Sequence, residues 1–143
     1  MLPRPARAGK RSSAVRRRHN ERADIVKIDK HLDLALIKVA GNIDYTSLKM
    51  SRAQLGIGDA ITVVGYPQGR DLSLLFGTVS SMNGPGGTIT ISTPIEPGQA
   101  GSPVLNKNGD VVAVVTRMYS DAVGGIATPI QLFKAMLALA GAE

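Results

Sequence analysis

The stretch TPIEPGQAGSPVLNKNGDVVAVVT, residues 93–116, decides the fold. It holds a loop rich in proline and glycine, followed by two strand-like runs, PVLN and VVAVVT. The residues KNGD join the two runs, and Asn108-Gly109 is a strong hairpin signal because both residues tolerate the positive φ of a tight reversal. The stretch therefore predicts two antiparallel strands that begin directly after a sharply bent loop.

Short apolar runs of the same kind extend outward from this stretch. Several of them alternate apolar and polar residues, which is typical of half-buried strands. NGPGG, residues 83–87, has the composition of a hairpin tip. The pattern predicts an all-β domain of eight or nine short strands. Before the opening stretch, the predicted strands cover residues 23–29, 33–39, 60–64, 73–82 and 88–95.

The C-terminal segment ATPIQLFKAMLALAG, residues 127–141, has a different period. Its apolar residues recur at helical spacing, which predicts one amphipathic helix. Thr128 is expected to be the N-cap, Pro129 the first helical residue, and Gln131 the partner in a capping box. Gly141 is expected to end the helix.

The composition limits the chemistry. The chain of 143 residues has no cysteine, so disulfides, thiolate metal sites and a cysteine nucleophile are excluded. No lysine or helix follows NGPGG as a phosphate loop requires, and no acidic cluster has metal-ligand spacing. We expect neither a cofactor nor a metal. No apolar run is long enough to span a bilayer.

Positive charge is concentrated at the N-terminus. Residues 1–22 hold eight Lys/Arg and one Glu, whereas the rest of the chain holds nine Lys/Arg and ten Asp/Glu. We expect residues 1–22 to form a basic, disordered arm. Three interpretations stay open: a passive or artefactual start, a transit peptide, and a tail for nucleic acid or another polyanion. The arm has no apolar core of a secretory signal, and the compartment stays unpredicted.

Five segments follow one another along the chain: DLALIKV, LGIGDAITVVGYPQG, LLFGTVSSM, TPIEPGQAGSPVLNKNGDVVAVVT and GGIATPIQLFKAML. In this order they resemble the C-terminal two-thirds of a trypsin-like peptidase domain of the bacterial HtrA type, from about residue 23 to the end. The resemblance implies two packed Greek-key β-barrels with the catalytic groups in the cleft between them.

The same resemblance implies an incomplete first barrel. Its remnant strands would lie within residues 23–39, followed by a second barrel over residues 55–128 and a helix over residues 129–141, all within a peptidase domain of residues 23–143. Remnant strands without their partners would expose apolar side chains and free edges. We therefore expect the chain to self-associate through this surface.

The resemblance also assigns site residues. Ala100 stands where the family has its nucleophilic serine, and Asp33 stands where it has the aspartate that orients the catalytic histidine. The backbone N–H groups of Gly98 and Ala100 map to the oxyanion hole, which does not depend on a side chain. Asp33 has an alternative role, because it could simply begin a strand and accept backbone N–H groups.

Substrate contacts follow from the same match. Thr116, Arg117 and Met118 map to the segment that pairs with an extended peptide by strand addition. Arg117 would favour an acidic peptide side chain, or it is a solvated surface residue. Pro94 maps near the base of the specificity pocket, where it would favour a small or apolar side chain.

A general base is missing from the pattern. His19 lies in the basic arm, His31 lies on a predicted turn, and neither stands in a motif like that of the family's histidine. Ser102 is two residues beyond Ala100, where the turn points it elsewhere. We predict an inactive serine endopeptidase homologue. The alternatives are a peptide-binding or scaffolding module that uses the cleft and a polyanion-binding protein that uses the arm.

Overall fold

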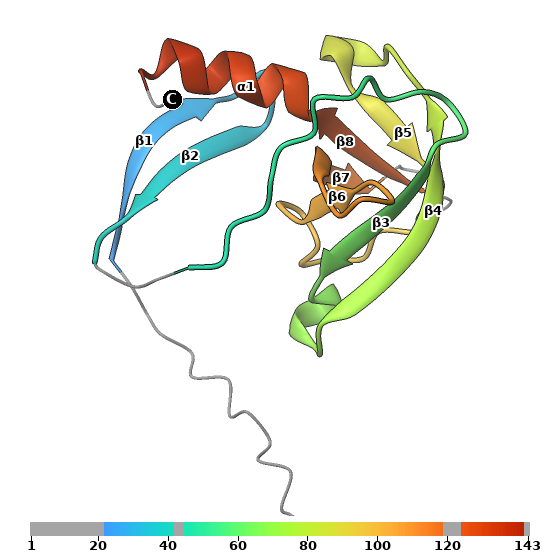
Figure 1. Cartoon of the computed structure of the whole chain (residues 1–143). Coiled ribbons are helices and arrows are strands. Elements are labelled where there is room, and N and C mark those ends of the chain that lie inside the picture. Colours follow the sequence, from blue (N-terminus) through green and yellow to red (C-terminus); the bar gives the residue numbers. More distant parts are fainter. Residues whose placement is uncertain (1–21, 42–44, 119–123, 142–143) are drawn as a thin grey trace, which may run out of the picture.

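The computed structural model describes residues 22–41, 45–118 and 124–141. Within them, a two-stranded hairpin stands beside a six-stranded closed barrel, and one helix lies over both (Figure 1). No helix in this described part is long and apolar enough to cross a membrane. The strands are β1 (Ala23–Asp29), β2 (Leu34–Val39), β3 (Ala60–Gly65), β4 (Ser73–Ser81), β5 (Ile89–Ile91), β6 (Pro103–Leu105), β7 (Val111–Met118) and β8 (Gly125–Pro129), followed by the helix α1 (Ile130–Leu139).

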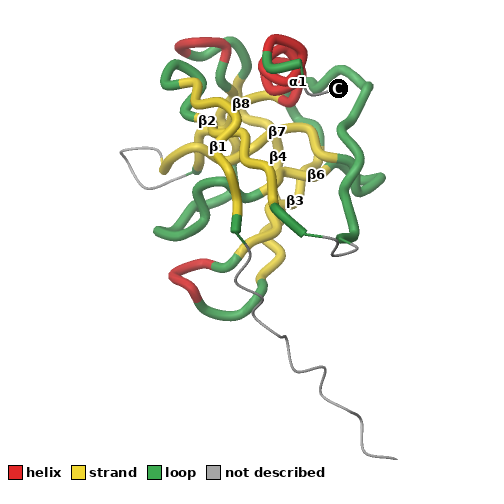
Figure 2. Tube along the Cα trace, turned by 90° about the vertical axis from the view of Figure 1, so that its left-hand side faces the viewer, coloured by secondary structure: helices red, strands yellow, loops and turns green. Residues whose placement is uncertain are grey.

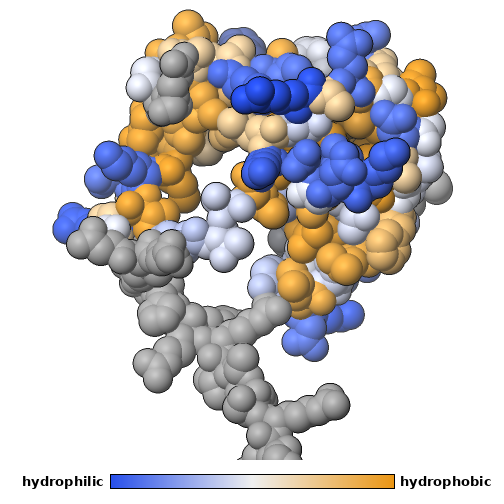
Figure 3. All heavy atoms as spheres, viewed as in Figure 1, coloured by the Kyte–Doolittle hydropathy of each residue, from blue (hydrophilic) through white to orange (hydrophobic). Residues whose placement is uncertain are grey.

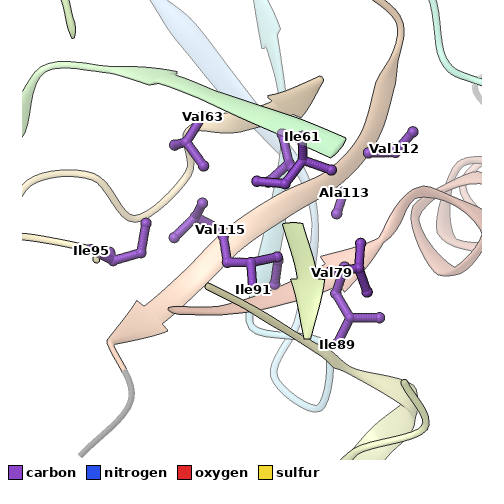
Figure 4. Close-up of a cluster of buried hydrophobic side chains, with 11 residues drawn as sticks. Ile61, Val63, Val79, Ile89, Ile91, Ile95, Val112, Ala113 and Val115 are labelled. Carbon is purple, nitrogen blue, oxygen red and sulfur yellow. The ribbon is translucent and has the colours of Figure 1, made fainter. Parts of the chain in front are cut away.

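The barrel is antiparallel throughout. Its strands follow the order β3-β4-β5-β8-β7-β6, and β6 pairs with β3 to close it. Alternate residues of each strand point inward, as the period of a strand requires. Figure 4 shows how these side chains meet in the interior. The core is almost entirely branched aliphatic: Ile61, Val63, Val79, Ile89, Ile91, Ile95, Val104, Val112, Ala113, Val115 and Ala127.

The expected strands agree closely with the observed ones. The prediction for residues 23–29 matches β1, and the other early strands agree within one residue at each end. β5 is much shorter than the predicted 88–95, because the chain leaves the barrel wall after Ile91 and enters the long loop to β6. The hairpin turn at Asn108-Gly109 is confirmed, and Gly109 has φ +81°.

The hairpin of β1 and β2 is irregular at one point. The two strands pair antiparallel from Ala23 opposite Val39 to Asp29 opposite Leu34, with a one-residue bulge between Ile25 and Lys27. The Asp29 carboxylate accepts the backbone N–H groups of the next turn, at 3.0 Å each. This side chain shapes the reversal before β2.

The helix α1 begins without the predicted cap. Thr128 is the fourth residue of β8 rather than an N-cap, and no side chain caps the helix. The Thr128 hydroxyl is fully buried and donates a hydrogen bond to the Leu32 carbonyl, at 3.1 Å. The capping prediction was wrong because this contact, 96 residues away in sequence, engages the hydroxyl instead. Figure 2 shows the helix nearly end-on, above the strands.

Candidate functional site

The loop from β5 to β6 carries the site, and its last part is tied to β7. Gly101 N–H donates to the Val115 carbonyl, and Val115 N–H donates to the Ser102 carbonyl, at 2.7 and 2.9 Å. Gln99 is fully buried, and its side-chain oxygen accepts the Glu96 N–H at 2.7 Å. We call residues 96–102 the nucleophile turn. These bonds hold its backbone in one shape.

Two backbone donors of the nucleophile turn are left free. Gly98 has φ +89°, a conformation that favours glycine. Within the described part of the chain, neither the Gly98 N–H nor the Ala100 N–H has a hydrogen-bond acceptor. Both residues are exposed. Free donors next to each other on an accessible turn can bind a carbonyl oxygen or an oxyanion.

The side chains of this turn offer no exposed hydroxyl group. Ala100 is exposed and presents only a methyl group. Ser102 is 8% exposed and packs under Gly65, where an added β-carbon would overlap the serine hydroxyl. Sequence reasoning did not single out Gly65, although a glycine at the end of a buried strand is a known sign of close packing.

The end of β7 has one unpaired edge. Arg117 pairs with Ile126 of β8 and Met118 with Gly125, whereas β6 pairs only with residues 111–114 of β7. Thr116 is buried, and its hydroxyl donates to the Ile126 carbonyl at 3.2 Å. Arg117 is exposed. Beyond the nucleophile turn, the described strands leave one side of residues 116–118 open to another strand.

The predicted specificity residue lies outside the barrel interior. Pro94 is exposed, whereas its neighbour Ile95 is only 7% exposed and belongs to the core. Ile95 packs so closely on Gly125 that an added β-carbon at Gly125 would overlap its Cγ1. Ile95 is therefore a better candidate than Pro94 for the wall of a specificity pocket next to β8. Its burial depends on the path of the loop, which the local sequence does not show.

Asp33 lies in the turn of the β1–β2 hairpin. It is exposed and has φ +55°, and β2 begins at the next residue. The backbone N–H groups of that turn bind Asp29 rather than Asp33. Sequence reasoning missed Asp29 as the turn-forming carboxylate. The β1–β2 turn contacts β8 through Leu32. The nucleophile turn contacts β7, which is the next strand along the barrel.

His31 and the nucleophile turn lie at opposite ends of β4. An added β-carbon on Gly86, in the turn η2 (Pro85–Gly87) after β4, would lie 4.0 Å from the His31 carbonyl oxygen. An added β-carbon on Gly98 would lie 3.4 Å from the backbone N of Gln68, in η1 (Pro67–Gly69) before β4. A strand of nine residues is about 27 Å long. His31 is therefore far from Ala100, and His19 lies outside the described residues.

The described residues contain no group of three or more histidine, aspartate or glutamate side chains arranged to hold a metal ion. The free backbone donors and the open strand edge are thus the chemical resources of this site. Together with the closed barrel they are features of barrels of the trypsin-like type.

Comparisons with known proteins identify the family. The family described as "Trypsin-like peptidase domain" matches residues 3–114. The match begins twenty residues before the resemblance found in the sequence. The chain belongs to the trypsin-like peptidase domain family, and its relatives place it with the HtrA type.

Three curated relatives illustrate the likeness. The uncharacterized protein y4bJ of Sinorhizobium fredii is 34% identical over 66% of this chain and 16% of its own length. The putative serine protease HhoA of Synechocystis is 30% identical over 76% of this chain and 31% of its own. A probable periplasmic serine endoprotease, DegP-like, of Pseudomonas fluorescens is 31% identical over 80% and 26%. The chain thus spans less than a third of each of these relatives.

Solved structures agree in fold. The Rv3671c protease of M. tuberculosis in its active form superposes with a TM-score of 0.76 and 25% identity, over 86% of this chain and 60% of that one. The HtrA-type protease AlgW with a decapeptide gives 0.74 and 23% identity, over 82% and 40%. The described fold is therefore that of an all-β, trypsin-like domain with a C-terminal helix.

Proposed function

We propose that this chain is a trypsin-like domain that binds an extended peptide without hydrolysing it. The observation that carries the proposal is the exposed methyl group of Ala100, at the position that the family resemblance assigns to the nucleophile. A methyl group has no lone pair to attack a carbonyl and no proton for a base to remove. Loss of the nucleophile alone lowers turnover about a millionfold in a triad enzyme.

In the described part of the chain, no histidine lies within reach of Ala100 as a general base. A base must lie within about 3 Å of the proton it removes, or one water molecule away. His31 is held at the far end of β4, beside η2. Asp33, in the same turn as His31, has no imidazole to orient next to Ala100. Restoring a serine at position 100 would therefore supply a nucleophile without its base.

Binding requires less than hydrolysis. The free N–H groups of Gly98 and Ala100 can donate hydrogen bonds to a peptide carbonyl oxygen, and the open edge of β7 at Arg117 can pair with the peptide backbone. The similar structure of the HtrA-type protease AlgW holds a decapeptide. We infer the same class of ligand here, an extended peptide segment, with Arg117 favouring an acidic side chain.

The test compares binding and turnover in the same samples. Fluorescent extended peptides with and without an acidic residue are titrated with the wild-type chain, and hydrolysis is followed in parallel. We expect saturable binding, no turnover above buffer, and no labelling by a serine-directed phosphonate. The variant Ala100→Ser should bind the peptides like the wild type and should also show no turnover. Turnover by either protein, or stoichiometric labelling of Ser102, would refute the proposed inactivity, and absence of binding would refute the peptide site.

The charge of residues 1–22 supports a second candidate function. This segment carries a net charge of +7, whereas the rest of the chain carries −1. A cluster of this kind attracts polyanions, with an affinity that falls steeply as salt displaces counterions. We expect single-stranded DNA or heparin to bind the intact chain and not a variant lacking residues 1–22. Peptide binding by that variant should be unchanged, which separates the two functions.

A further inference from the structure

The free donors of the nucleophile turn take their direction from the carbonyl group in the same peptide unit. A trans peptide unit is planar, and its C=O and N–H groups point in opposite directions. No peptide bond in the described part of the chain is cis. The Gly98 N–H shares its peptide unit with the Pro97 carbonyl, and the Ala100 N–H shares its unit with the Gln99 carbonyl. The groups that bind these two carbonyls therefore decide where the two N–H groups point.

Different parts of the chain bind the two carbonyls. The Gln99 carbonyl accepts the Ser102 N–H at 3.0 Å, within the nucleophile turn itself. The Pro97 carbonyl accepts the Gln68 N–H at 2.8 Å, and Gln68 lies in η1, on the loop between β3 and β4. The nucleophile turn therefore orients its second donor by itself, whereas the direction of its first donor depends on another loop.

The peptide unit of Pro97 and Gly98 is easily turned. Its orientation depends on ψ of Pro97 and on φ of Gly98. The proline ring fixes φ of its own residue and leaves ψ free. Glycine has no β-carbon and adopts φ values of either sign, and Gly98 stands at +89°. The bond from Gln68 is therefore what keeps this N–H in one direction.

Gln68 has a backbone that needs support. Its φ is +52°, in the left-handed region that is unfavourable for a residue with a β-carbon. Its side-chain Nε2 donates to the Glu96 carboxylate at 3.2 Å, and its Oε1 accepts from the Arg70 guanidinium at 2.9 Å. Figure 3 shows hydrophilic residues at the lower tip of the barrel, where Figure 1 draws the loop between β3 and β4. A strained residue persists where its surroundings hold it in several ways, and these two bonds are such holds.

We propose that Gln68 is a positioning residue of the peptide site. Its N–H binds the Pro97 carbonyl and so aims the Gly98 N–H at the bound peptide. Its side-chain bonds to Glu96 and Arg70 keep it in the left-handed conformation that this contact requires. Gln68 acts through the peptide unit of the nucleophile turn rather than by touching the ligand. The inference rests on the peptide binding proposed above.

Asn83 offers a matched control. It also has a β-carbon at positive φ, +58°, and it is exposed like Gln68. It follows the end of β4, whereas η1 precedes the beginning of that strand. A truncation at Asn83 therefore changes the same kind of residue at the end of β4 that is remote from the nucleophile turn.

Peptide affinity is the first measurement. The peptide carries no charged side chain, so that Glu96 and Arg70 do not attract it directly. Gln68→Ala in the full chain should weaken binding about fivefold, the factor expected when one hydrogen bond is lost. Asn83→Ala should bind like the wild type. Thermal unfolding confirms that both variants keep a cooperative transition.

An exchange of donor and acceptor tests the side-chain bond. Gln68→Glu places a carboxylate opposite Glu96 and removes the donor, so it should weaken peptide binding as Gln68→Ala does. Adding Glu96→Gln returns an amide donor to the same contact from the other side, and it should restore most of the affinity. Failure of the double variant to recover would exclude this bond from the positioning.

The amide resonance of Gly98 reports the positioning without a peptide. It should be one narrow signal in the wild type, and rotation of the peptide unit should broaden it in Gln68→Ala, as relaxation dispersion measures. The Ala100 amide should stay narrow in both proteins, because its direction is fixed within the nucleophile turn. The Gly98 signal is assigned by its loss in Gly98→Ala.

The outcomes separate this inference from the proposed function. A wild-type chain that binds no peptide would refute the peptide site, and exchange at Gly98 in Gln68→Ala would then still support the positioning. Wild-type affinity in Gln68→Ala together with a narrow Gly98 signal would overturn the positioning role alone. An equal loss of affinity in Asn83→Ala would also overturn it, because the effect would then be common to both loops.

Discussion

Gly65 and Ser102 lie against each other so closely that a β-carbon on the glycine would overlap the serine hydroxyl oxygen. The contact joins the end of β3 to the base of the nucleophile turn. It explains why Ser102, two residues beyond Ala100, is buried.

Gly65→Ala should destabilise the barrel by about 1–3 kcal/mol, because the new methyl group overpacks a filled site. Ser102→Ala in the same protein should restore most of this loss, since the overlap is with the hydroxyl. Urea denaturation midpoints measure both effects. Gly56→Ala is the control, because its β-carbon would make only ordinary contacts, 3.6 Å from Asp59. If the stability changes of Gly65→Ala and Ser102→Ala simply added up in the double mutant, the result would contradict the contact.

Gly98→Ala should weaken peptide binding, whereas Gly109→Ala should not. Both glycines have positive φ, +89° and +81°, so alanine costs each about 1–2 kcal/mol of stability. Relief of that strain would turn the peptide unit at residue 98 and misdirect a free N–H of the nucleophile turn. Peptide titration and thermal unfolding of both variants give the comparison. Equal peptide binding by Gly98→Ala and Gly109→Ala would mean that the backbone donors of the nucleophile turn are not part of the binding site.

Thr128→Val should loosen the hairpin. The substitution keeps the shape of a fully buried side chain and removes the hydroxyl that binds the Leu32 carbonyl. A lost hydrogen bond costs about 1 kcal/mol, which corresponds to about fivefold more opening. Limited trypsin digestion at Lys27 and Lys30 should accelerate by that factor. Thr128→Ser retains the hydroxyl and should be digested like the wild type.

Thr93→Val should raise stability, whereas Thr128→Val should lower it. Thr93 is 1% exposed, and its hydroxyl oxygen has no hydrogen-bond partner among the described residues. Replacing it with an apolar group of the same shape removes an unsatisfied polar atom, so stability should rise by about 0.5–2 kcal/mol. Thermal unfolding measures the change. A loss of stability would mean that the hydroxyl has a partner.

Local pattern predicted most of the barrel, because strand alternation and turn chemistry are local. Asn108-Gly109 and the apolar period of β1 were sufficient to place their elements. Thr128 was assigned to the wrong role because its partner, Leu32, is remote in sequence. Local signals choose an element, whereas tertiary contacts decide what a polar group in it binds.

The candidate site shows the same division. The family resemblance assigned Gly98 and Ala100 as backbone donors, an assignment that stays a prediction, whereas the burial of Gln99 and Ile95 depends on how the loop folds back on the barrel. The position of Asp33 relative to Ala100 depends on the path of the whole hairpin. Neither follows from spacing along the chain.

The bulge in β1 has a consequence for changes in chain length. An inserted or deleted residue normally reverses the facing of every later side chain in a strand. Here the extra residue, Val26, is already accommodated, so Ile25 and Ile28 share one face. Removing Val26 would leave ADIKID, in which apolar and charged residues alternate strictly. The hairpin can therefore lose a whole residue from the middle of a strand and keep both of its surfaces.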